Sequence, residues 1–63
     1  MASPVRFAEV KALLERYGWS LERVSGSHHY FTKPGDRPWS IPVKRNLVKA
    51  EYVRQIKKHV GES

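Results

Sequence analysis

Two stretches of helical periodicity enclose a middle segment of alternating apolar residues, and this order limits the folds open to the chain. In the first stretch apolar side chains recur every three or four residues, at Phe7, Val10, Leu14 and Tyr17. This spacing predicts a helix over about residues 4–17. We expect the Ser3 hydroxyl to cap that helix and Pro4 to occupy its first turn.

The second stretch lies at the other end of the chain, where the apolar stripe consists of Tyr52, Val53, Ile56 and Val60. It predicts a helix over about residues 48–60. Asn46 is the expected N-cap and Gly61 the expected end of this helix. We expect His59 to bind the free carbonyls of the last turn.

The middle segment predicts strands, because its residues alternate and are rich in aromatic and β-branched types. The predicted strands cover residues 19–24, 28–32 and 39–43. Pro42 cannot donate to a ladder, so the third of them should be an edge strand or should end at that residue. We predict an α+β fold of order α-β-β-β-α, in which a three-stranded antiparallel sheet carries both helices on one face.

Length and composition restrict the chain further. A chain of 63 residues has room for one domain, 1–63, and without cysteine it can form no disulfide and no thiolate metal site. No apolar run approaches the roughly 20 residues of a membrane span. No signal-peptide pattern opens the chain. We therefore expect a cytoplasmic protein with no membrane partner.

The charge is basic and unevenly distributed. The net charge is +6, and residues 33–63 hold eight Lys or Arg against three Asp or Glu, a net of +5 in that half. A basic half favours a polyanionic partner, because neutralising phosphates releases condensed counterions. Nucleic acid is the expected partner, and an acidic protein remains open.

Several kinds of catalytic site have no support in the sequence. The six carboxylates form no close pairs, and the four glycines stand singly, so neither a two-metal centre nor a phosphate-binding loop is predicted. We predict no metal and no cofactor. The remaining candidate for a catalytic site is the segment 26–31, which contains His28 and His29, because histidine is the side chain that exchanges protons near neutral pH.

Strand parity separates the two histidines of that segment. If Phe31 faces the core, His29 shares its side, whereas His28 and Tyr30 lie on the open face of the sheet. His28 is then the candidate for chemistry and His29 a packing residue. Trp39 shares the parity of the apolar positions in its strand and is assigned to packing. A plain phosphate contact by His28 remains the alternative.

Four segments of the chain resemble one family. They are the helix and its exit at residues 11–19, Arg23 followed by Gly-Ser-His-His-Tyr-Phe at 26–31, Ile-Pro-Val at 41–43, and Tyr-Val-Arg-Gln-Ile at 52–56. In this order they resemble the HicA (YcfA-like) mRNA interferase toxins, whose fold is similar to the double-stranded-RNA-binding domain. The resemblance covers about residues 6–60.

The resemblance implies an RNA-cleaving toxin whose partners are mRNA and a HicB-type antitoxin. The family's catalytic histidine falls on His28. Many members carry another histidine after the Pro-Val of the third strand, where this chain has Lys44. Lysine supplies a fixed positive charge there, and it is a poor proton carrier near neutral pH.

These considerations give a hypothesis for the site. His28 exchanges protons with the RNA, and His29 and Lys44 are possible auxiliary groups. The residues expected to bind RNA are Ser27, Tyr30, Lys44, Arg45, Lys49, Lys57 and Lys58. Two other interpretations stay open, namely an RNA-binding module that uses the same basic face without cutting and a domain that binds an acidic protein. The exposed edge strand is compatible with a homodimer.

Overall fold

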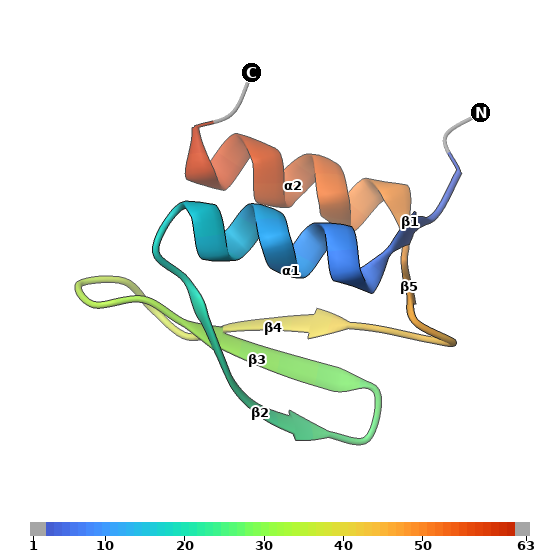
Figure 1. Cartoon of the computed structure of the whole chain (residues 1–63), viewed down its shortest axis with the longest axis horizontal. Helices are drawn as coiled ribbons and strands as arrows, with labels where there is room; N and C mark the ends of the chain where they lie inside the picture. Colours follow the sequence, from blue (N-terminus) through green and yellow to red (C-terminus); the bar gives the residue numbers. More distant parts are fainter. Residues whose placement is uncertain (1–2, 62–63) are drawn as a thin grey trace.

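A computed structural model describes residues 3–61 and places two helices over one face of a small sheet (Figure 1). The elements are β1 (Val5–Arg6), α1 (Phe7–Arg16), β2 (Ser20–Ser25), β3 (His28–Thr32), β4 (Trp39–Pro42), β5 (Leu47–Val48) and α2 (Ala50–Val60). Strands β2, β3 and β4 form an antiparallel sheet in that order. The predicted α+β class and the α-β-β-β-α order are confirmed, and β1 and β5 are additions to it.

The first helix begins later than predicted. Its N-cap is Arg6, with an extended backbone and no side-chain hydrogen bond, so the predicted capping by Ser3 and Pro4 is wrong. The residues before the helix instead pair with β5, Val5 opposite Val48. The N–H of Phe7, which has no partner within its helix, donates to the Asn46 carbonyl at 2.7 Å. This long-range pairing decides where the helix starts.

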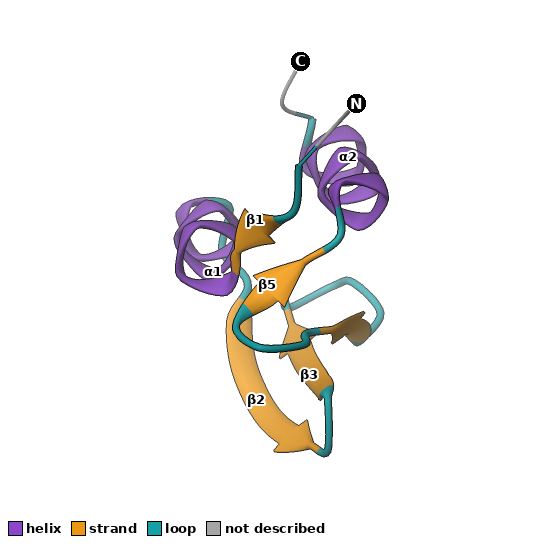
Figure 2. Ribbon diagram, turned by 90° about the vertical axis from the view of Figure 1, so that its right-hand side faces the viewer, coloured by secondary structure: helices purple, strands orange, loops and turns teal. Residues whose placement is uncertain are grey.

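The second helix also begins later, and Asn46 is not its cap. The N-cap is Lys49, without a side-chain hydrogen bond. Arg45 and Asn46 instead form a tight turn with positive φ angles of 54° and 63°, closed by mutual backbone hydrogen bonds between Lys44 and Leu47 at 3.0 and 2.9 Å. Asparagine tolerates this conformation better than most residues. Figure 2 shows β1 next to α1, and β5 between α2 and the three-stranded sheet.

The register of the sheet contains one irregularity. Leu21 lies opposite Phe31, but Arg23 lies opposite Tyr30, so Glu22 is an extra residue in β2. Such a bulge turns the following side chains toward the other face. As a result Arg23 lies on the side of Tyr30 and not on the side of Phe31. At the other edge, β4 pairs with β3 alone, as Pro42 predicts.

The core lies between the helices and the inner face of the sheet. Its most buried side chains are Val10, Leu14, Phe31, Ile41, Val48 and Ile56. Trp19 is also buried, and Trp39 packs beside it with ring centroids 6.0 Å apart, so the assignment of Trp39 to packing is confirmed. Within residues 3–61 no polar or charged side chain is buried. The polar groups that could perform chemistry therefore lie at the surface, except for the buried Nδ1 atom of the half-buried His29.

The end of α2 differs from the prediction in one respect. Gly61 ends the helix in a left-handed conformation, as predicted, and its N–H binds the last carbonyls. His59 does not bind those carbonyls, so that prediction is wrong. Its Nε2 lies 3.2 Å from Asp36 Oδ2, and its ring contacts Trp39 with centroids 4.6 Å apart. The β3–β4 loop is thereby held against α2.

Candidate active site

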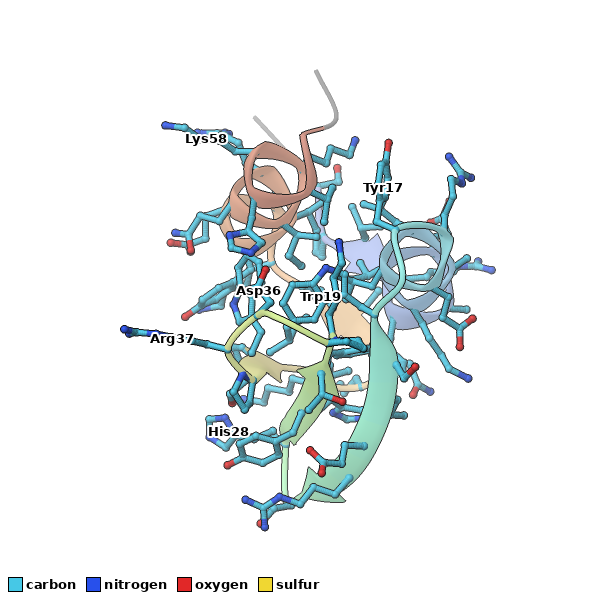
Figure 3. The ribbon with its side chains drawn as sticks, turned by 90° about the vertical axis from the view of Figure 1, so that its left-hand side faces the viewer. Tyr17, Trp19, His28, Asp36, Arg37 and Lys58 are labelled. Atoms are coloured by element: carbon cyan, nitrogen blue, oxygen red, sulfur yellow. The ribbon has the colours of Figure 1, made fainter. Side chains whose placement is uncertain are left out.

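The face of the sheet away from the helices carries His28. Its side chain is exposed and projects from the sheet on the side opposite α2 (Figure 3). The Nδ1 atom of His28 lies 3.2 Å from the Ser40 hydroxyl on β4. A hydrogen bond at one ring nitrogen fixes the ring and leaves Nε2 free to exchange a proton. The His28 imidazole is therefore exposed to a ligand and held in one orientation by Ser40.

Tyr30 and Arg23 extend this surface along the sheet. The Tyr30 ring centroid is 6.5 Å from that of His28, and the Arg23 guanidinium carbon lies 4.5 Å above the Tyr30 ring. Stacking on an aromatic face suits a guanidinium and leaves its N–H groups available to an anion. The open face thus combines a cation, an aromatic ring and an imidazole.

His29 lies on the opposite face, as strand parity predicts. Its ring packs on Phe7 with centroids 4.5 Å apart, and its Nδ1 is buried without a hydrogen-bond partner. The sheet separates it from His28. The structure therefore does not bring His29 to the same surface as His28, and an auxiliary role for it stays a prediction.

Three of the predicted RNA-binding residues gather at the end of the sheet next to His28. Ser27, Lys44 and Lys49 line one pocket at the start of β3 and the end of β4. Arg45 lies on the adjoining turn, where it lines a neighbouring hollow with Arg6. The predicted cations of this group therefore lie around the end of the sheet at which β3 begins, and their contact with RNA stays a prediction.

The last two predicted RNA-binding residues lie elsewhere. Lys57 lines a groove between the helices together with Glu9 and Arg16. Lys58 projects from the outer side of α2, far from His28 in Figure 3. The structure does not bring these lysines to the surface that carries His28, so a role for them in RNA binding stays a prediction.

Residues 7–62 match the model of one protein family, described as "HicA toxin of bacterial toxin-antitoxin". The match covers nearly all of the chain, including both helices and the strand of His28. The chain belongs to the HicA toxin family. A search of curated proteins finds no significant match.

Family membership assigns this HicA chain to the toxins of toxin–antitoxin systems and implies a cognate antitoxin as its partner. Within residues 3–61 no helix has the length and apolar character to cross a membrane. No group of three or more His, Asp or Glu residues in that range could hold a metal ion.

Two residues of this candidate site were missing from the sequence-based prediction. Ser40 alternates with Trp39 and Ile41, so parity alone could have placed it on the face of His28. Arg23 could not have been found in this way. Regular alternation would put it on the side of Leu21, and only the bulge at Glu22 brings it over Tyr30.

Proposed function

We propose that this HicA toxin is a metal-independent endoribonuclease that cleaves mRNA with His28 as its general acid–base. The observation that carries the proposal is the exposed imidazole of His28, held at Nδ1 by Ser40 on a cationic surface. Imidazole exchanges protons near neutral pH, and guanidinium and ammonium groups attract the RNA backbone.

The reaction uses the nucleophile that RNA itself carries. His28 Nε2 accepts the proton of a 2′-hydroxyl, and the 2′-oxygen forms a bond to the adjacent phosphorus. The bond from phosphorus to the 5′-oxygen breaks, and that oxygen leaves with a proton from imidazolium or water. The products are a 2′,3′-cyclic phosphate and a free 5′-hydroxyl. In this tautomer the Nδ1–H of His28 donates to the Ser40 hydroxyl.

Fixed cations stabilise the charge that develops on the phosphate. Lys44 lies two residues after Pro42, the β4 residue that pairs with His28 at the start of β3, and Arg45 follows it. Lysine is a poor proton carrier near neutral pH, so the site has one acid–base group. One such group contributes roughly 10²–10⁴-fold to a rate. We therefore expect a slow enzyme.

The second candidate function is RNA binding without cleavage. It is favoured by one observation, namely that Lys44 stands where many family members have a histidine. A binding module would use the same cations and Tyr30, since bases stack on aromatic rings without regard to sequence. The two candidates differ in whether RNA is cut.

Other parts of the proposal concern partners and location. We propose that the antitoxin is of the HicB type and that the toxin acts on mRNA in the cytoplasm. The free edges of β2 and β4 offer backbone groups that a second copy of the chain could pair with. Sedimentation of the purified toxin over a range of concentrations tests for the homodimer.

The experiment compares His28→Gln with His29→Gln. The two substitutions are chemically identical and fall on adjacent residues of opposite faces. The purified variants and the wild type are incubated with RNA in EDTA, after circular dichroism has established that each is folded. We expect wild type and His29→Gln to cut and His28→Gln to be inactive. Cleavage by His28→Gln would contradict the proposal, and salt-sensitive binding without any cleavage would favour the binding module.

A further inference from the structure

A pocket of about 340 Å³ lies at the end of the sheet where β3 begins and β4 ends. Its wall contains Ser27, Pro42, Lys44, Leu47, Lys49 and Tyr52. Tyr52 comes from the first turn of α2, and Leu47 from β5. The pocket is therefore formed where the β4–β5 turn, the β2–β3 turn and α2 meet, the end of the molecule that Figure 2 faces.

The wall of this pocket is amphipathic. Tyr52 is half-buried, and Leu47 is one of the two exposed large hydrophobic residues of the described chain, with 38% of its surface accessible. Lys44 and Lys49 are exposed beside them, and no carboxylate lines the pocket. A ligand that satisfies both parts has a flat apolar body and a negative charge, as a nucleotide does.

The pocket is continuous with the strand end that carries His28. Ser27 immediately precedes His28, and its carbonyl accepts a hydrogen bond of 2.7 Å from the N–H of Val43. His28 itself lies opposite Pro42, another residue of the pocket wall. An RNA chain whose phosphate lies at His28 can therefore place its adjacent nucleotide in this pocket.

We propose that the pocket binds one unstacked nucleotide of a single-stranded RNA, with the base against Tyr52 and Leu47 and the phosphates at Lys44 and Lys49. This inference rests on the proposed ribonuclease function and names its substrate class. A base can enter only if it is free of its neighbours and of a pairing strand. The toxin should therefore select single-stranded RNA, although its fold resembles a domain that binds duplexes.

Affinity is measured with a His28→Gln background, so that cleavage does not consume the probe. Fluorescence anisotropy of a labelled single-stranded oligoribonucleotide gives the dissociation constant, and the same oligonucleotide annealed to its complement is the duplex control. One base stacked on an aromatic ring corresponds to roughly a 5- to 150-fold change in affinity. We expect Tyr52→Leu to weaken binding within that range, Tyr52→Phe to retain it, and the duplex to bind more weakly.

Three further variants and one control keep the test independent of the stability of Tyr52→Leu. Leu47→Glu alters an exposed position and places a carboxylate where the nucleotide would lie, so it should weaken binding at least tenfold (on the order of one lost base contact). Lys44→Gln and Lys49→Gln should each lower the slope of log affinity against log salt by about 0.7. Arg37→Gln, on the loop at the other end of the sheet (Figure 1), should leave that slope unchanged.

The outcomes separate this inference from the ribonuclease proposal. Binding that depends on Tyr52, by a wild-type toxin that does not cut, would support the pocket and contradict the enzyme. Cleavage combined with equal affinity of Tyr52→Leu and Tyr52→Phe would contradict the pocket and leave the enzyme standing. Equal affinity for single-stranded and duplex RNA would overturn the inference, as would full affinity in Leu47→Glu. Full affinity of Leu47→Glu for RNA is also the result expected if the pocket binds an acidic protein and RNA binds at another surface.

Discussion

The hydrogen bond between His28 and Ser40 makes the orientation of the imidazole testable by one substitution. Ser40→Ala removes the hydroxyl that lies 3.2 Å from His28 Nδ1. Ser40 is exposed, so its loss should change the free energy of unfolding by less than about 0.5 kcal/mol. The effect on activity should be larger than the effect on stability, because the ring of His28 has no other hydrogen bond among the described contacts.

The magnitude follows from the kind of bond. A neutral hydrogen bond contributes about 0.5–1.5 kcal/mol, which corresponds to roughly a 2- to 12-fold change in rate. Since both groups are exposed to water, the lower half of that range is expected. Ser40 lies on the face of His28 and outside the pocket wall, so kcat should fall while KM stays the same.

The assay is steady-state cleavage of a fluorogenic single-stranded RNA by wild type, Ser40→Ala and Ser40→Thr. Threonine keeps the hydroxyl, so it should restore most of the lost kcat. A wild-type kcat in Ser40→Ala would show that Ser40 does not position His28, and would refute this role. A loss of activity in Ser40→Thr as large as that in Ser40→Ala would refute the role as well, because the hydroxyl would then be irrelevant.

Three further predictions concern stability and the acid–base inventory. Phe31→Ala should lower the free energy of unfolding by about 3–5 kcal/mol, out of the roughly 3–9 kcal/mol expected for a domain of this size, and thermal unfolding should lose its cooperativity. The control is Val24→Ala, at a position that is 52% exposed, which should change the free energy of unfolding little. The pKa of Asp36 lies below its usual value of 3.8, mainly because its carboxylate accepts a hydrogen bond from the Arg37 N–H and, second, one from His59. These bonds therefore stabilise the folded protein above pH 3.8, and this contribution is lost as the pH falls through the pKa of Asp36 in the folded state. The melting temperatures of wild type and Asp36→Asn should therefore converge in acid, and a constant difference down to the lowest pH would contradict this. Lys44→His adds a proton carrier and should raise kcat, by no more than roughly 10²–10⁴-fold, whereas an unchanged or lower kcat would show that the position takes no part in proton transfer.

Much of the fold could be predicted because its elements have strong local signals. The apolar stripes of both helices and the alternation around Phe31 correspond to the observed core. Parity also placed His28 on the open face and His29 under the helices, because the pairing of β3 with β4 is regular. These assignments depend on periodicity within one element, which the sequence displays directly.

The errors all involve contacts between distant segments. Ser3 and Pro4 form a good capping sequence, but the pairing of Val5 with Val48 keeps the chain extended beyond them. A strand of two residues has no periodicity to detect. Asn46 is as suitable for a turn as for a cap, and the carbonyl contact with Phe7 decides in favour of the turn. His59 contacts Asp36, which lies 23 residues away in the sequence, and no local pattern predicts such a contact.

The central claim is that RNA supplies its own nucleophile and that His28 removes the proton from it. The most direct test is the chemistry of the cut ends, read by mass spectrometry after digestion of a defined single-stranded RNA in EDTA. Attack by the 2′-hydroxyl should leave 2′,3′-cyclic phosphate and 5′-hydroxyl ends, and the RNA should not be cut where a 2′-deoxynucleotide replaces the nucleotide before the cleavage site. Products with 5′-phosphate and 3′-hydroxyl ends, or cleavage after the 2′-deoxy position, would contradict it, because water would then be the nucleophile.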